Sequence, residues 1–148
     1  MKRTALYLVL ALALFAIGPI SQGQDDRGFQ VVVHADNPAT SVERSRLSKM
    51  FLKKIKRWDG GDTPVVPIDL GDKSPVREAF TRAVHKKSIG AIKSYWQRQI
   101  FSGRDVPPDE VASDEEVLQR VAANPAAVGY VASGAPLGDG VKVLEVAY

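Results

Sequence analysis

The residues most suited to chemistry form a turn between an apolar segment and the start of a helix. Val65–Asp69 is typical of a short buried strand, and Ser74-Pro75 is typical of an N-cap serine followed by a proline in the first helical turn. The first turn of a helix has free backbone N–H groups and the positive end of the helix dipole, which attract small anions. The pattern predicts either a site for an oxyanion such as phosphate or sulfate, or a serine that caps its helix and binds nothing.

Other residue types that carry chemistry are present, but not in catalytic or metal-binding patterns. His34 and His85 are far apart and lack metal-ligand spacing, and the acidic run Asp114-Glu115-Glu116 belongs to the start of a helix. Ser133-Gly134 lacks the pattern of a nucleophile elbow, and the sequence has no phosphate-cradling glycine-rich loop of the nucleotide-binding kind. The sequence therefore predicts no catalytic residue, no metal, no cofactor and no enzymatic activity.

The N-terminus has the pattern of a secretory leader. Lys2 and Arg3 precede the apolar run Ala5–Ile17, which is too short for a membrane span of roughly 18 residues or more. Small residues follow, so we predict a signal peptide over residues 1–23 and a single domain over residues 24–148. The chain contains no cysteine, so it has neither a disulfide framework nor a lipid-anchored thiol. A periplasmic protein, soluble after cleavage, is the predicted product.

Charge is unevenly distributed along the predicted domain. Residues 24–148 carry 18 Lys and Arg against 17 Asp and Glu, but residues 44–104 hold 15 basic and 5 acidic side chains. Residues 105–148 hold only 2 basic and 8 acidic side chains. The basic middle segment favours an anion, an anionic lipid or an acidic partner, or consists of solvated helix faces. We predict no nucleic-acid partner, because the protein is expected outside the cytoplasm and no motif combines aromatic and basic residues for base readout.

The apolar pattern predicts strands that alternate with helices. Trp96 lies on an apolar helix face with Ile89, Ile92 and Ile100, so we expect it in the core, and we expect a structural role for His85 at a helix end. A layered α/β domain follows, with a largely parallel sheet flanked by helices. The predicted strands are Phe29–His34, Val65–Asp69, Val128–Val131 and Val141–Val146. The predicted helices include Leu47–Phe51 with a cap at Ser41 or Ser45, one from Pro75 through Val84, Ile89–Ile100, and one from Ser113 to Val121.

The order of these motifs resembles that of the phosphate-binding periplasmic receptors of ABC-type phosphate transporters. Those receptors have an "IFLGK…W" helix, a "V-x-R…SGT…F" turn from strand to helix, and a "PGAIGYV" strand. The matching segments here cover about residues 29–146. They are Leu47–Lys54 with Trp58, Val66–Asp69 with Ser74–Phe80, and Asn124–Val131.

The resemblance implies which residues bind the ligand. In the family, the Ser-Gly-Thr turn donates hydroxyl and amide hydrogen bonds to a desolvated phosphate, and by position this turn is Ser74-Pro75-Val76. Pro75 has no N–H and Val76 has no hydroxyl, and each missing donor to a buried charged ligand costs about 1.5–3 kcal/mol. Arg77 in the next position is expected to return part of that loss through a charge-assisted contact. The implied ligand-binding residues are therefore Ser74, Val76 and Arg77.

The resemblance also implies an architecture and a function. The family has a type 2 periplasmic-binding-protein fold in which two lobes close over the ligand, and this chain resembles one lobe only. One expectation is a binding protein that captures phosphate or a similar oxyanion, works with an ABC transporter membrane component, and rebuilds a cleft as a homodimer. The other is an interaction module that docks a periplasmic or membrane partner and has lost oxyanion binding.

Overall fold

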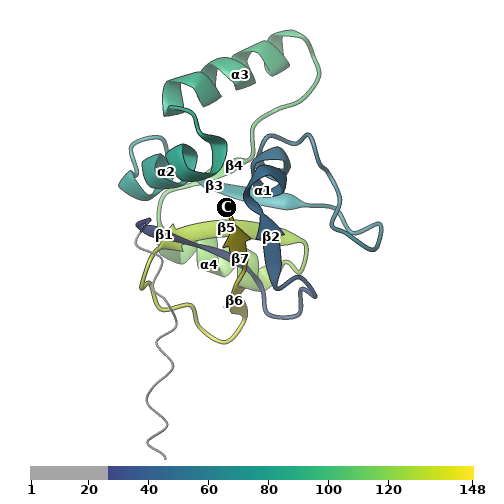
Figure 1. Ribbon diagram of the computed structural model, residues 1–148, viewed down its shortest axis with the longest axis vertical. Helices are drawn as coiled ribbons and strands as arrows, with labels where there is room; N and C mark the ends of the chain where they lie inside the picture. The colour runs from purple at the N-terminus through teal and green to yellow at the C-terminus, as the bar shows by residue number, and fades with distance from the viewer. Residues whose placement is uncertain (1–26) are drawn as a thin grey trace, which may run out of the picture.

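The structure, a computed structural model, describes residues 27–148. The predicted leader lies outside the described residues. Seven strands and four α-helices alternate along the chain (Figure 1). The strands are β1 (Phe29–His34), β2 (Ser41–Glu43), β3 (Val66–Leu70), β4 (Asp109–Val111), β5 (Ala127–Ala132), β6 (Val141–Val143) and β7 (Glu145–Ala147). The helices are α1 (Arg44–Phe51), α2 (Pro75–Phe80), which continues as the π-helix η1 (Thr81–His85), α3 (Ile89–Phe101) and α4 (Asp114–Ala123).

The central sheet is largely parallel, as the sequence predicted. Its strand order is β4-β3-β5-β1-β6, and β3 pairs in parallel with both β4 and β5. Only β1 runs against its neighbours, since it is antiparallel to β5 and to β6. A separate two-stranded parallel sheet joins β2 to β7. The parallel arrangement brings the C-terminal ends of β3, β4 and β5 to the same edge of the sheet.

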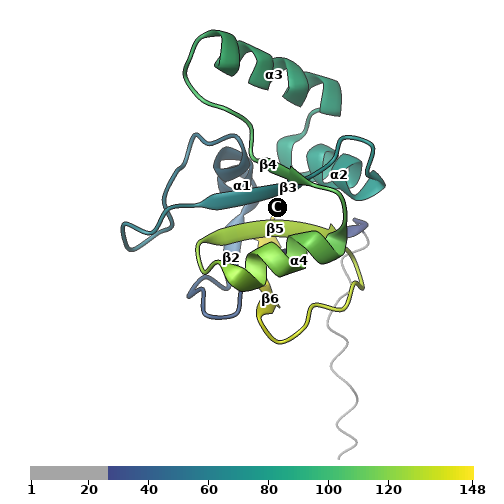
Figure 2. The same ribbon diagram turned by 180° about the vertical axis from the view of Figure 1, so that it is seen from behind.

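Helices cover both faces of this sheet. Seen from behind, α4 lies across β5 (Figure 2), while α1 and α2 lie on the opposite face (Figure 1). Gly129 in β5 explains how closely α4 approaches, because a Cβ atom there would lie 2.6 Å from Val117 Cγ1. On the α1 and α2 side, Phe80 stacks on Tyr130 with a centroid separation of 3.8 Å, and Phe29 and Phe51 complete an aromatic core.

Helix α3 is set apart from this layered body (Figure 1). Its buried side chains, Ile92 and Trp96, form a small cluster with Leu52, separate from the main core. The prediction that Trp96 is buried is confirmed, since its side chain is 6% exposed. Ile100 does not join the predicted apolar face, because it is 51% exposed near the free end of the helix.

Several predicted boundaries were wrong for local reasons. Helix α1 begins after Glu43, which makes no side-chain cap, because Ser41 lies in β2 and Ser45 lies inside the helix. The single strand predicted over 141–146 is two strands, since the buried Leu144 divides β6 from β7. The helix that starts at Pro75 changes to π geometry at Thr81, whose buried hydroxyl has no hydrogen-bond partner among the described residues.

Candidate functional site

The predicted turn lies at the edge of the sheet where β3 and β4 end. The Gly71 N–H donates to the carbonyl of Val111 at 3.2 Å, which ties the turn to the end of β4. Ser74 is the N-cap of α2, as predicted: its Oγ accepts the Arg77 N–H at 3.3 Å. The Ser74 hydroxyl hydrogen therefore stays available to a ligand, since a hydroxyl donates and accepts at once.

One backbone donor of this helix start is free. Pro75 has no N–H, and the Arg77 and Glu78 N–H groups donate to Ser74. The Val76 N–H has no partner among residues 27–148, so it is the unpaired donor that the first turn offers. The Val76 side chain is half-buried and packs against the main core, which fixes the orientation of its backbone.

Arg77 lies beneath the turn and is 4% exposed. Its Nη2 is 3.1 Å from Asp69 Oδ2, and its Nη1 donates to the Leu70 carbonyl and lies 3.4 Å from Glu110 Oε1. The guanidinium therefore has protein partners on β3 and β4. An oxyanion contact from Arg77 would require it to leave at least one of them.

Asp69 is the centre of a buried polar cluster that sequence reasoning missed. Its Oδ1 accepts from the Tyr130 hydroxyl, and from the Leu70 N–H at 3.2 Å. Burial raises the pKa of Asp69 to about 6, opposed mainly by the positive charge of Arg77. Burial and the neighbouring Asp69 carboxylate also raise the pKa of Tyr130. The sequence signal that could have indicated this cluster is an acidic residue at the end of an apolar strand, followed by an arginine in the next helix.

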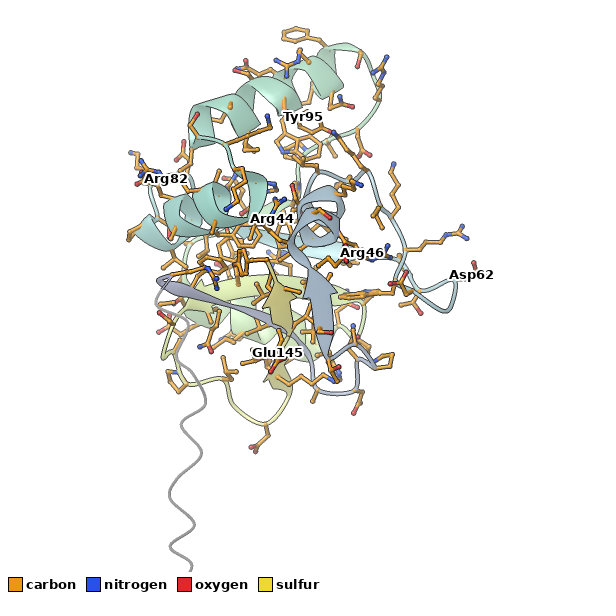
Figure 3. The ribbon with its side chains drawn as sticks, in the orientation of Figure 1. Arg44, Arg46, Asp62, Arg82, Tyr95 and Glu145 are labelled. Carbon is orange, nitrogen blue, oxygen red and sulfur yellow. The ribbon has the colours of Figure 1, made fainter. Side chains whose placement is uncertain are left out.

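His85 forms a second buried polar contact, on the far end of the α2–η1 helix. Its Nδ1 is 2.8 Å from Ser48 Oγ on α1, and its ring packs edge-on against Phe80. Burial and, after it, the positive charges of Arg77, Arg44 and Lys87 together lower the pKa of His85 to about 4. Arg44 lies between α1 and this helix (Figure 3) and donates to the Val84 carbonyl at 2.7 Å. His85 is therefore neutral at pH 7 and stabilises the helix end through packing and a hydrogen bond, not through charge.

Residues 27–148 contain neither a group of side chains that could hold a metal ion nor a helix that could span a membrane. Within residues 27–148, no group of three His, Asp or Glu side chains is arranged to hold a metal ion. No helix in this part of the chain is long and apolar enough to cross a membrane.

The fold and the sequence together define the class of protein. A family model described as a PBP superfamily domain matches residues 27–145. The chain therefore belongs to the periplasmic-binding-protein superfamily, and it has the architecture of one lobe.

Several solved structures that are similar to the chain are described as phosphate transport or phosphate-binding proteins. The chain is similar to an ABC-type phosphate transport receptor from Vibrio cholerae, with 21% identity and a TM-score of 0.63 over 80% of this chain and 46% of the receptor. A protein from Clostridium perfringens, assigned as a phosphate ABC transporter substrate-binding protein and solved with bound phosphate, is 22% identical. Its TM-score is 0.64 over 80% of this chain and 44% of that protein. PstS from Borrelia burgdorferi is 18% identical, with a TM-score of 0.57 over 80% of this chain and 47% of PstS.

These similarities establish the fold, and they show how much of a receptor this chain corresponds to. The chain spans less than half the length of each of these receptors. By their descriptions these similar structures are a transport receptor and a substrate-binding protein. Among curated proteins, none is significantly similar to the chain.

Proposed function

We propose that this protein is a periplasmic solute-binding lobe that binds phosphate or a similar oxyanion at the turn 71–76. The observation that carries the proposal is the unpaired Val76 N–H at the start of α2, beside a Ser74 hydroxyl whose hydrogen is free. Both donors lie at the carboxyl ends of parallel strands, where ligands of open α/β sheets bind. The exposed Lys73, whose charge also acts on Asp72, adds positive charge beside them.

The expected affinity is modest. Arg77 is held by Asp69, and Pro75 supplies no donor, so the turn offers fewer contacts than a Ser-Gly-Thr turn. A single lobe also leaves the bound anion facing water, where each contact is weaker than in a closed cleft. We therefore expect a dissociation constant on the order of 1 mM, which corresponds to about 4 kcal/mol.

Calorimetric titration of phosphate at low salt, on protein freed of bound phosphate, tests the proposal. Ser74→Ala removes a hydrogen bond to a charged ligand, so the affinity should fall about tenfold, equivalent to about 1.4 kcal/mol. Ser113→Ala is the matched control, because Ser113 caps α4 in the same way through the Glu116 N–H. Binding that does not saturate at phosphate concentrations tenfold above the expected dissociation constant of about 1 mM would contradict oxyanion binding at this turn. An equal loss of affinity in Ser74→Ala and Ser113→Ala would contradict it too.

A second candidate function is that of an interaction module, and one observation favours it. Phe101 and Val106 are 91% and 59% exposed, and Ile100 adds a further exposed apolar side chain at the same end of α3. Exposed apolar groups of this size are typical of a surface that contacts a partner, such as a transporter membrane component or a second copy of the chain.

Photo-crosslinking from position 101 in cells tests this candidate. A docking surface should give one defined adduct, and Ile100→Ser should remove it without changing phosphate binding. No defined adduct, together with saturable phosphate binding that Ser74→Ala weakens, would favour the solute-binding function.

A further inference from the structure

A cavity of about 360 Å³ lies between α3 and the segment that follows α1, away from the turn 71–76. Its apolar wall includes Leu52 and Ile92, which are 8% and 3% exposed. Tyr95 lies on the side of α3 that faces the body of the molecule (Figure 3), and its hydroxyl donates to the Leu52 carbonyl at 2.9 Å. The tyrosine ring is thereby held in place as part of the wall.

The polar lining is cationic. Lys54, Lys87 and Arg98 line the cavity together with the hydroxyl-bearing Ser94. Ser94 and Arg98 are one turn apart on α3, so they lie on the same face of the helix. Lys54 comes from the other wall, and its Nζ lies 5.5 Å from the centre of the Tyr95 ring. Positive groups from two separate segments therefore converge on one cavity.

These three cations have no acidic partner among the described residues. Neighbouring cations do: Lys93 pairs with Asp72, and Lys56 pairs with Asp105 at 2.7 Å. Residues 79–104 contain no Asp or Glu, and Asp105, whose charge acts on Tyr95, is already paired with Lys56. Three cations around an apolar cavity repel one another unless an anion lies between them. The charge arrangement matches an anionic ligand.

We propose that this cavity binds a phosphate-type anion attached to an apolar group. The cations and the Ser94 hydroxyl would bind the anion, and Leu52, Ile92 and the Tyr95 ring would contact the apolar part. The same chemistry is offered by a soluble organic phosphate and by an anionic phospholipid headgroup. The site is separate from the proposed oxyanion turn, since none of the residues that line the cavity belongs to the turn 71–76.

Titration with phenyl phosphate, followed residue by residue by NMR of the purified protein, tests the cavity. Phenyl phosphate should bind at least tenfold more tightly than inorganic phosphate or benzyl alcohol, and its shifts should centre on residues 91–98. The double variant Lys87→Gln/Arg98→Gln should weaken binding at least tenfold. Arg104→Gln, an exposed cation outside the cavity, and Ser74→Ala, in the turn, should leave it unchanged.

Vesicles distinguish the two sources of the ligand. Co-sedimentation with phosphatidylglycerol vesicles but not phosphatidylcholine vesicles, lost in the double variant, would assign the ligand as a lipid headgroup. Phenyl phosphate binding without vesicle binding would assign a soluble ligand. The proposal is overturned if neither probe binds, if Arg104→Gln weakens binding as much as the double variant, or if phenyl phosphate shifts only residues of the turn 71–76.

Discussion

Arg77 has a different environment from the one its position in the sequence indicated. A cation in the first turn of a helix is ordinarily solvated, but here it is buried against Asp69, with the Tyr130 hydroxyl on the same carboxylate. A buried pair contributes little net stability, yet removal of one partner leaves an uncompensated charge. Arg77 is consequently a residue on which the turn depends structurally, whether or not it contacts a ligand.

We expect Arg77→Ala to destabilise the fold by about 3–5 kcal/mol, since Asp69 would be left buried without its counter-charge. Urea unfolding followed by circular dichroism measures the change. Arg104→Ala is the control, because an exposed, unpaired arginine should change stability by no more than about 0.5 kcal/mol. Equal stability of Arg77→Ala and the wild type would show that the buried pair is absent in solution.

Asp69 and His85 should oppose each other in the dependence of stability on pH. The pKa of Asp69 is raised to about 6, so its contribution is fully present below pH 3.8 and is lost as pH rises through 6. The pKa of His85 is lowered to about 4, so its contribution is present above pH 6.5 and is lost as pH falls through 4. Between pH 4 and 6 the two effects have opposite signs and similar size.

His85→Gln should therefore reveal the effect of Asp69. Relative to the wild type, the variant should gain about 3 kcal/mol of unfolding free energy as pH falls from 6 to 4. Urea unfolding at several pH values measures this difference, and the other shifted carboxylates, Asp72 and Asp105, cancel because both proteins contain them. Parallel pH profiles for the two proteins would show that His85 is not held neutral by the fold.

At the scale of elements, α3 depends on few contacts. It is attached to the body through the cluster of Ile92, Trp96 and Leu52, the Tyr95 hydrogen bond to the Leu52 carbonyl, and the exposed Lys93–Asp72 ion pair. The main core does not include these residues. A helix with so few buried contacts is expected to open independently of the sheet.

Trp96→Ala should release α3 without unfolding the domain. Amide hydrogen exchange in residues 89–101 should accelerate at least tenfold, while β5 keeps its protection, because β5 belongs to the separate main core. Ile100→Ala is the control on the same helix, since that side chain is half exposed. Simultaneous loss of protection in α3 and β5 would show that the two clusters unfold as one unit.

Elements with strong local signals could be predicted from the sequence, and elements fixed by distant partners could not. The apolar runs of β1, β3 and β5 and the caps Ser74 and Ser113 follow from short-range rules. Strands β2, β4 and β7 have three residues each, and they are strands only because distant segments pair with them.

Some features of the candidate site could likewise be predicted from the sequence, and others could not. The capped helix start at Ser74 was predictable because its signal spans four residues. The Asp69–Arg77–Tyr130 cluster could not be predicted, because Tyr130 is 61 residues from Asp69 in the sequence. Tyr130 also lies in an apolar strand, and nothing in that strand indicates which residue its hydroxyl contacts. The cationic cavity was represented only as an excess of charge over residues 44–104, since charge counting does not show which cations converge.

At the scale of the whole molecule, the single lobe leaves its strand ends without a facing partner. The receptors that are similar in fold are longer, and the matched part of this chain corresponds to less than half of each. The edge where β3, β4 and β5 end carries the turn 71–76, so any second wall for a ligand must come from outside the described residues. A weak, open oxyanion site is the expected outcome of that geometry.

The position of β1 in the sheet sets the order in which this chain can fold during synthesis. Residue Phe29 pairs with Ala132, and His34 pairs with Val141, so the first strand has both of its neighbours in the last quarter of the chain. While the ribosome is still making α3, the apolar segment Phe29–His34 has no partner strand and the sheet lacks its middle. Native contacts of such long sequence separation form late and slowly. The middle of the sheet around β1 can therefore assemble only after residues 127–143 have been made.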